Sequence, residues 1–444
     1  MAMVAVHSST AHSAVLLVGP GGDFSTIQAA VDVAASNMES DEIRIAEGTF
    51  TESVRMFRFV DHDGLSISGG WDPSFSAIEG TSIINGGGIG RVLDMSIIEG
   101  DVVELRNLIF EDGAAENNAG VLASVTDATL LISSSIVRNN IASGVRSEGG
   151  GLVIRGRGSA DVRLIQVTIA DNQVLCSGNF SCSVGGLRLD GDDEVYFEVT
   201  GSTIEGNRVE VLNSQGSQAG ASISSTSGGT VVFNDNVVRD NVVVANDSGI
   251  VGVVLSAGVS LSAARNQILR NTAESAAPEF SSQMRVNAFV DAEVTVENTL
   301  IADGNGKGLV TRIFDNGTAA ALHLVNLTIA NHGDIGLQGV NLSDTAAFTI
   351  SNSIVTGSRI DLIASAAQQT TNLIGASGLF VNEALGNYQL AAGSPAIDAG
   401  TFPAPVPIGS GDAAGLTRVV GSAIDIGALE FGADVLFSNG FELN

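Results

Sequence analysis

Residues 164–174 read LIQVTIADNQV, and close relatives of this stretch return along most of the chain. We assign as equivalents of Ile169 the residues Ile109, Ile136, Ile204, Val238, Ile268, Ile301, Ile329 and Ile354, which are 25 to 35 positions apart. A unit of this size cannot bury its own apolar face and must stack on copies of itself. The sequence therefore predicts a repeat array.

The pattern within each repeat indicates strands. Apolar and polar residues alternate, as in Val195, Phe197 and Val199, which is the period of a strand with one buried face. Clusters of Gly, Asn, Asp and Ser, such as residues 303–306, separate these runs and are typical of turns. No long helical stripe interrupts the array. We therefore expect an all-β solenoid of parallel strands, with one coil per repeat.

An asparagine column supports stacked coils. Three positions after the key apolar residue, five consecutive repeats have Asn139, Asn172, Asn207, Asn241 and Asn271. Equivalent positions in stacked parallel coils are about 4.8 Å apart, so the amides can form a ladder along the axis. The sequence predicts a structural role for these residues, and His332 stands where an asparagine would continue the column.

Charged residues form a second column one position earlier. Here Arg138 stands between Glu111 and Asp171, and Arg270 stands between Asp240 and Asp303. We expect both arginines to form ion pairs across coils, each worth about 0 to 1 kcal/mol. This interpretation removes them from the catalytic candidates.

Composition excludes several classes of partner. The 444 residues have a formal charge of -29, which argues against binding nucleic acid or an anionic membrane. No run of eighteen apolar residues is present, so we expect no membrane-spanning helix. Lys307 is the single lysine.

We divide the chain into four segments. Residues 1–13 look like a leader remnant or an added sequence, and 14–60 are expected to form a cap helix and the first coil. In the latter, Asp23 or Ser25 would cap a helix that buries Phe24, Ile27 and Val31. Residues 61–364 form the coils, and 365–444 form the last coils, a C-terminal cap and a tail. The close pair Cys176 and Cys182 favours a disulfide and an extracytoplasmic location.

Stretches near both ends of the chain resemble known families. Residues 24–31, FSTIQAAV, and 43–52, IRIAEGTFTE, resemble the entry segment of the pectate-lyase-like superfamily. Residues 388–400, YQLAAGSPAIDAG, and 425–431, DIGALEF, are similar to the closing segment of bacterial choice-of-anchor Q proteins. The resemblance implies a single-stranded right-handed parallel β-helix with an N-terminal capping helix, secreted or on a bacterial cell surface. It assigns no activity, since the superfamily holds enzymes, adhesins and inert stalks.

The catalytic sets of the superfamily are incomplete in this chain. Of the four polygalacturonase motifs, only the pair at residues 192–193 is present. Lyases of this fold use Ca²⁺ and a Lys or Arg base. The candidate Ca²⁺ ligands are Asp190, Asp192, Asp193 and Glu194. As an alternative, these four residues form a solvated turn. Candidate catalytic residues are Lys307, Arg312 and His332.

Two functions therefore remain open. The first is a secreted or cell-surface protein that binds polysaccharide or a cell-surface glycan, without a complete catalytic set. The alternative is a Ca²⁺-assisted polysaccharide lyase, or another polysaccharide-active enzyme. An anionic substrate would have to approach an acidic protein, so the lyase hypothesis requires bridging Ca²⁺.

Overall fold

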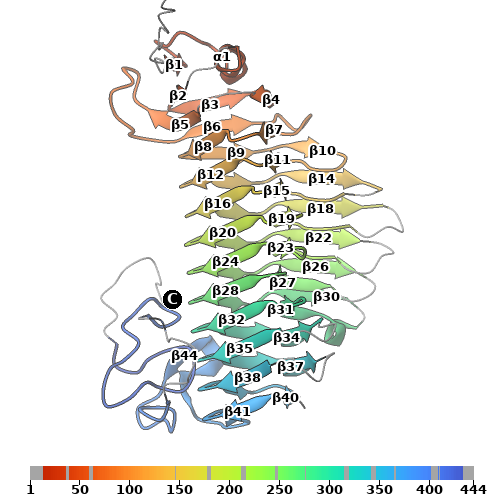
Figure 1. Ribbon diagram of the computed structural model, residues 1–444, viewed down its shortest axis with the longest axis vertical. Helices are drawn as coiled ribbons and strands as arrows, with labels where there is room; N and C mark the ends of the chain where they lie inside the picture. Colours follow the sequence, from red (N-terminus) through yellow and green to blue (C-terminus); the bar gives the residue numbers. More distant parts are fainter. Residues whose placement is uncertain are drawn as a thin grey trace, which may run out of the picture.

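The chain winds into a long stack of coils whose strands pair in parallel with the coils before and after (Figure 1). A computed structural model describes residues 14–36, 40–59, 64–145, 147–177, 182–211, 217–245, 249–275, 277–314, 320–341, 347–364, 367–401, 409 and 411–433. Only β43 and β44 pair antiparallel among the described strands. The predicted parallel β-helix with one capping α-helix is confirmed, while residues 1–13 lie outside the described part.

Two long sheets run along the stack. Sheet A contains β1 (Ala14–Val18), β2 (Asp41–Ala46), β5 (Leu65–Trp71), β8 (Val102–Arg106), β12 (Thr129–Ser133), β16 (Asp161–Ile165), β20 (Tyr196–Thr200), β24 (Thr230–Asn234), β28 (Ser260–Ala264), β32 (Glu293–Glu297), β35 (Ala321–Val325), β38 (Ala347–Ser351) and β41 (Gln368–Thr370). Sheet B contains β3 (Gly48–Thr51), β6 (Ser82–Asn85), β9 (Leu108–Glu111), β13 (Ile136–Arg138), β17 (Thr168–Ala170), β21 (Thr203–Glu205), β25 (Val237–Arg239), β29 (Gln267–Leu269), β33 (Leu300–Gly304), β36 (Thr328–His332), β39 (Ile354–Thr356) and β42 (Leu373–Ile374).

A third long sheet closes the coils and a fourth projects from them. Sheet C contains β4 (Val54–Phe59), β7 (Leu93–Ile98), β11 (Val121–Thr126), β15 (Leu152–Arg157), β19 (Leu187–Gly191), β23 (Ala221–Ser225), β27 (Ile250–Ala257), β31 (Ser282–Ala288), β34 (Lys307–Ile313), β37 (Ile335–Asn341) and β40 (Ile360–Ile363). Sheet D contains β10 (Ala114–Ala115), β14 (Ile141–Gly144), β18 (Gln173–Cys176), β22 (Arg208–Val211), β26 (Val242–Ala245) and β30 (Thr272–Glu274). The remaining elements are α1 (Ile27–Ala34), η1 (Pro278–Phe280), η2 (Glu383–Leu385), β43 (Phe380–Asn382) and β44 (Asn387–Leu390).

Alternation along the strands fills the interior of the stack. Leu164, Ile169 and Leu189 point inward from sheets A, B and C of neighbouring coils and join one continuous apolar core. Burial of each such side chain stabilises the fold by roughly 1.5 to 3 kcal/mol. The opposite face of each strand is left for the surface or for other parts of the chain.

The asparagine ladder exists, but its first member is Asn140 and the prediction of Asn139 was wrong. Val137, not Ile136, pairs with Ile169, so the register shifts by one residue. Asn139 instead adopts a left-handed backbone with φ 55° in the turn. The same shift affects two other assigned positions. Ile109 pairs with Ile136 of the next coil, and Ile354 pairs with Thr328 of the previous coil.

The ladder satisfies buried backbone groups coil by coil. The Nδ2 of Asn207 donates to the carbonyl oxygen of Ile169 at 2.9 Å, and its Oδ1 accepts from the Nδ2 of Asn172 at 3.0 Å. Glycines lie opposite the ladder, because a Cβ at Gly186 would be 2.5 Å from the carbonyl oxygen of Gly220. Only glycine therefore fits at this place beside the ladder.

A second ladder at the turn between sheets A and B was not predicted. The Oδ1 of Asn236 accepts from the backbone N–H of Ser202 at 2.9 Å, and the Oδ1 of Asn266 accepts from that of Asn236 at 3.0 Å. Serine takes the same place in some coils, which hides the column in the sequence. Both ladders are buried and therefore structural.

The ion pairs across coils are confirmed in part. Arg138 pairs with Glu111 at 2.7 Å, and Arg270 pairs with Asp240 at 2.8 Å. The second partners, Asp171 and Asp303, form no ion pair with them in the described part of the chain. Ala170 is the register neighbour of Arg138, so Asp171 stands one position further along.

Helix α1 lies against the first coils at the N-terminal end (Figure 1). Its N-cap is Thr26, not Asp23 or Ser25, and the carboxylate of Glu52 accepts from the backbone N–H groups of Ile27 and Gln28 at 2.9 and 3.0 Å. A carboxylate at a helix N-terminus satisfies free donors and complements the helix dipole. The motif that suggested a β-helix entry segment thus builds the cap.

The C-terminal segment, the described residues within 376–433, folds back along sheet B (Figure 1). Leu379, Phe380 and Leu429 pack against Leu300 and Ile354 on the outer face of that sheet. Inside this segment Arg418 is buried, and its Nη2 donates to the carbonyl oxygens of Asp425 and Gly427 at 2.8 and 2.7 Å. The expected C-terminal cap therefore covers a side of the stack.

Candidate functional site

Two predicted catalytic residues lie on sheet C. Lys307 begins β34 and Arg312 precedes its last residue, so they are about 17 Å apart along one strand. Lys307 was expected in a turn, but it pairs in the sheet with Ser282, and its Nζ is 6.0 Å from the ring centroid of Phe280. Arg312 points outward, because Leu309, Thr311 and Ile313 fill the inward positions.

His332 lies inside the stack. It occupies the ladder position on β36, and its Nε2 is 3.2 Å from the carbonyl oxygen of Ile301. Burial lowers its pKa to about 4, so the imidazole is neutral at physiological pH. The structure thus separates His332 from the surface that holds Lys307 and Arg312.

Arg285 was missed by the sequence analysis and lies beside Arg312 on the outer face of sheet C. Its strand, β31, pairs with β34, and Arg312 is in register with Asn287, two positions beyond Arg285. Burial and the charge of Arg312 lower the pKa of Arg285 to about 10. Only the register of two different repeats brings these arginines together, so no local motif could have revealed them.

The four candidate Ca²⁺ ligands do not converge. Asp190 pairs with Arg188 at 2.6 Å on the outer face of sheet C, whereas Asp192 lies in the following turn, 3.8 Å from Arg157. Asp193 has φ 68°, which fits a turn residue. No group of three or more His, Cys, Asp or Glu side chains in the described ranges could hold a metal ion.

A cluster of polar side chains around Tyr196 lies on the outer face of sheet A. Arg163 donates to both carboxylate oxygens of Asp161 at 2.8 and 2.7 Å, and its guanidinium carbon is 5.2 Å from the ring centroid of Tyr196. The Tyr196 hydroxyl donates to Glu198 at 3.3 Å. Burial and the neighbouring Glu198 raise the pKa of Tyr196, so the hydroxyl stays protonated.

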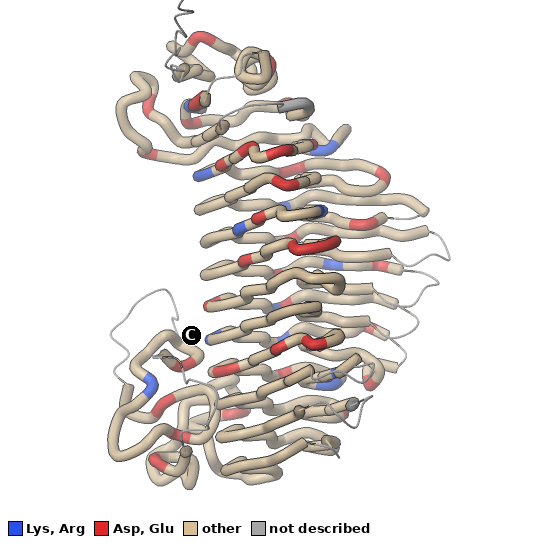
Figure 2. Tube along the Cα trace, viewed as in Figure 1, with Lys and Arg blue, Asp and Glu red and all other residues tan. Residues whose placement is uncertain are grey.

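Hydroxyl groups extend this cluster along the stack. Thr230 follows Tyr196 in register, and its Oγ1 is 3.1 Å from the Oγ of Ser260 in the next coil. Glu198 is likewise followed by Val232 and Ser262. The result is a strip of one aromatic ring, charged groups and hydroxyls across adjacent coils. Figure 2 shows how acidic and basic residues are distributed along the stack.

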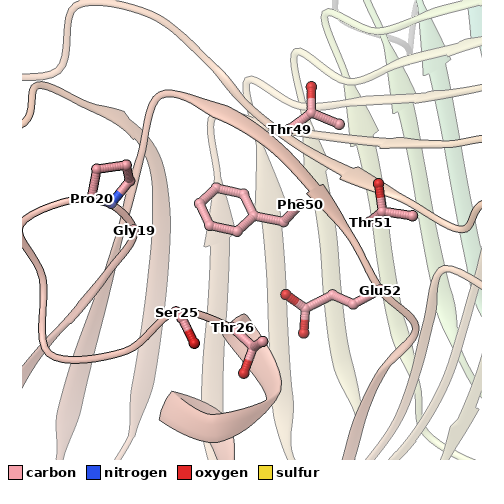
Figure 3. Close-up of a pocket in the computed structure, with 8 residues that line it drawn as sticks. All are labelled: Gly19, Pro20, Ser25, Thr26, Thr49, Phe50, Thr51 and Glu52. Carbon is pink, nitrogen blue, oxygen red and sulfur yellow. The ribbon is translucent and has the colours of Figure 1, made fainter.

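A hollow at the N-terminal end has a volume of about 480 Å³ (Figure 3). Thr49, Phe50 and Thr51 of β3 line one side, and Ser25 and Thr26, just before α1, line the other. Glu52 points toward the helix, where both its carboxylate oxygens accept backbone hydrogen bonds. This charged group is therefore committed to holding α1.

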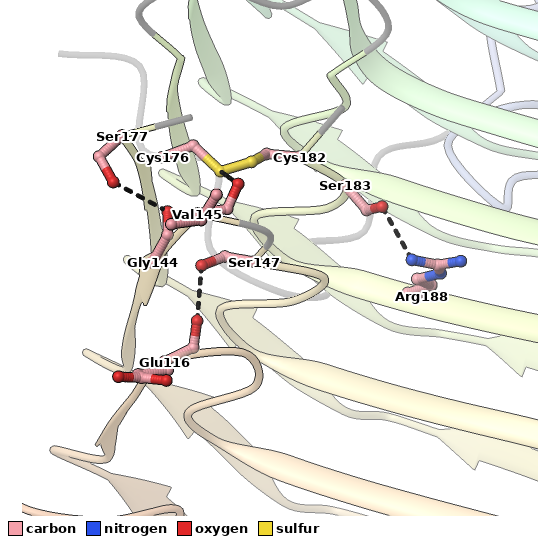
Figure 4. The surroundings of a disulfide bond; sticks show 9 residues. All are labelled: Glu116, Gly144, Val145, Ser147, Cys176, Ser177, Cys182, Ser183 and Arg188. Carbon is pink, nitrogen blue, oxygen red and sulfur yellow. Dashed lines mark hydrogen bonds between the residues drawn. A yellow bond between two sulfur atoms is a disulfide. The ribbon is translucent and has the colours of Figure 1, made fainter. Parts of the chain in front are cut away.

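Cys176 and Cys182 form the predicted disulfide (Figure 4). Their Cα atoms are 6.4 Å apart, and both side chains are buried with Val174 and Val209 beneath sheet D. The neighbouring Ser183 accepts from Nη1 of Arg188 at 2.8 Å, which links this loop to sheet C. The disulfide thus joins the end of β18 to the segment that leads into β19.

Comparison with solved structures supports the fold. Pectate lyase Pel9A has a TM-score of 0.51 and 13% identity, covering 96% of this chain and 98% of its own. The chain has a pectate-lyase-like fold. A pectin methylesterase from Aspergillus niger has a TM-score of 0.28 and 15% identity, covering 74% of this chain and 87% of its own. No family model and no curated protein matches the sequence, so the finer resemblance to choice-of-anchor Q proteins stays a prediction.

Proposed function

We propose that this protein binds polysaccharide on the outer face of sheet A, around Tyr196. The observation that carries the proposal is the side-by-side placement of Tyr196, Arg163, Asp161 and Glu198 on two adjacent strands. Tyrosine and arginine are enriched at recognition surfaces because each offers a large apolar face with a polar end. A flat array of this kind suits a chain of sugars lying along the coils.

The chemistry of the cluster matches sugar hydroxyls. Asp161 and Glu198 supply acceptors, Arg163 supplies donors, and the oxygen of the Tyr196 hydroxyl can accept a further hydrogen bond. The ring of Tyr196 supplies an apolar platform for the C–H face of a sugar. Arg163 already holds Asp161 and lies over the ring, so the donors and acceptors are fixed before a ligand arrives, which lowers the entropy cost of binding.

The test is binding of the whole protein to a panel of neutral and acidic polysaccharides by affinity electrophoresis. Tyr196→Ala should weaken the binding of any ligand found by at least about tenfold, the cost of one good contact. Thr203→Ala, on sheet B of the same coil, is the matched control and should bind normally. Equal binding by both variants would reject the Tyr196 surface. The disulfide supports the companion proposal of a secreted or cell-surface location.

A Ca²⁺-assisted lyase is the second candidate, and the lowered pKa of Arg285 favours it. Lyases of this fold abstract a proton with Lys or Arg, and an arginine of pKa about 10 loses its proton more readily than an ordinary one. Incubation with pectate, alginate, chondroitin and heparin, with Ca²⁺ or a chelator, would reveal unsaturated products by ultraviolet absorbance. Product that disappears with the chelator and in Arg285→Gln would establish this function in place of binding alone.

A further inference from the structure

We infer that Arg285 and Arg312 form an oxyanion-binding site on the outer face of sheet C. The ligand is a carboxylate, sulfate or phosphate group with a hydroxyl beside it. The site lies on a different sheet from Tyr196 and is independent of the function proposed there.

The first argument is charge pairing. In a chain of charge -29, most of the described arginines hold a carboxylate, such as Arg138 with Glu111 and Arg265 with Asp235. Within the described ranges, Arg285 and Arg312 form no ion pair, and the two positive charges are adjacent across strands β31 and β34. Like charges at such positions destabilise a sheet unless a counter-charge joins them.

The second argument is a buried donor. Arg285 lies in register between Val254 and Val310, both buried although they point outward from the stack. The Nε of Arg285 is buried and has no hydrogen-bond acceptor among the described residues. A buried donor without a partner destabilises the protein, and such groups commonly mark the place of a water or an ion. A guanidinium binds the paired oxygens of an oxyanion through two parallel hydrogen bonds.

The third argument concerns the hydroxyl group that the ligand carries beside its oxyanion. Asn287 stands in register with Arg312, and its Nδ2 donates to the Oγ of Ser256 at 2.9 Å. This bond leaves the Oδ1 of Asn287 buried and without a donor in the described part of the chain. An oxyanion cannot fill that place, because it has no hydrogen to donate. A hydroxyl next to the oxyanion can, as in a hydroxy acid or an acidic sugar.

The experiment is calorimetric titration of the full chain with sodium sulfate, D-glucuronate and D-glucose, at ionic strength held constant with chloride. We expect saturable binding of sulfate and tighter binding of glucuronate, with none of glucose. Arg312→Gln should weaken both anions at least tenfold, whereas Arg106→Gln on sheet A, an exposed control, should change neither. Asn287→Ala should reduce glucuronate to the affinity of sulfate.

A stability readout separates this role from a structural one. Arg285→Met should abolish anion binding and raise the melting temperature of the free protein, because it removes a buried charge without a partner. A lower melting temperature in Arg285→Met, together with unchanged anion binding in Arg312→Gln, would overturn the site. These results do not depend on binding through Tyr196. The anion site and the polysaccharide surface can therefore be rejected independently of each other.

Discussion

The imidazole Nε2 of His332 donates to the carbonyl oxygen of Ile301 at 3.2 Å. This is the position in which the Nδ2 of Asn271 donates to the carbonyl oxygen of Val238 at 3.0 Å, so histidine continues the ladder. Since a carbonyl can only accept, the proton is on Nε2. Nδ1 has no partner among the described residues, which leaves the ring with one bond where asparagine makes several.

The burial of His332 predicts that the protein loses stability in acid. Burial holds the pKa of His332 at about 4, against 6.5 for an ordinary histidine, so the unfolded chain binds more protons between these values. The free energy of unfolding should therefore fall by about 3 kcal/mol as pH drops through this window. His332→Asn should remove that part of the loss, measured by denaturant unfolding at pH 7 and pH 4.5. An identical pH dependence in both proteins would contradict the assignment.

The corrected register predicts a large loss of stability on substitution of Asn140 and a small loss on substitution of Asn139. The Oδ1 of Asn140 accepts from the backbone N–H of Gly113 at 2.8 Å, and its Nδ2 donates to the carbonyl oxygen of Phe110 at 3.2 Å. Asn140→Ala leaves buried groups unpaired and should cost about 2 to 4 kcal/mol. Asn139→Gly keeps the left-handed backbone and should cost less than about 1 kcal/mol. Thermal unfolding compares them, and a larger loss at Asn139 would restore the original register.

The disulfide predicts a moderate contribution to stability. Closing the short loop between Cys176 and Cys182 should stabilise the fold by about 2 kcal/mol through the entropy of the unfolded chain. Replacing both cysteines by serine should lower the melting temperature to that of the reduced protein. If reducing agent lowers the melting temperature of the double variant as well, the effect does not come from this bond.

The buried arginine of the C-terminal segment predicts a local opening. The guanidinium of Arg418 is 3.5 Å from the buried carboxylate of Glu430. Arg418→Met removes this partner and should lower the free energy of unfolding by about 3 to 5 kcal/mol. Limited proteolysis should then cut within residues 376–433 first. The matched control is Arg270→Met, whose exposed ion pair should contribute about 0 to 1 kcal/mol. Equal protease resistance of the two variants would show that Arg418 does not hold the segment.

The sequence predicts this fold well because its signals are local. Strand alternation and the repeated asparagine are visible within one repeat, and both appear in the structure. The register was wrong at Ile136 because Val137 is also apolar, and only pairing with Ile169 decides between them. Arg285 and Arg312 were not linked because their proximity depends on how far each repeat is offset from the next. Likewise, nothing in residues 376–433 indicates which side of the stack they cover.

The contact of the C-terminal segment with sheet B also has a mechanical consequence. A repeat array held by nearest neighbours alone can lose its terminal coils one at a time. Here Gln267 donates to the carbonyl oxygen of Ala413, and Thr328 accepts from the backbone N–H of Ala428, so one segment spans coils from β29 to β39. A pulling force applied beyond residue 433 would act as shear on this whole interface. We therefore expect these coils to unfold together.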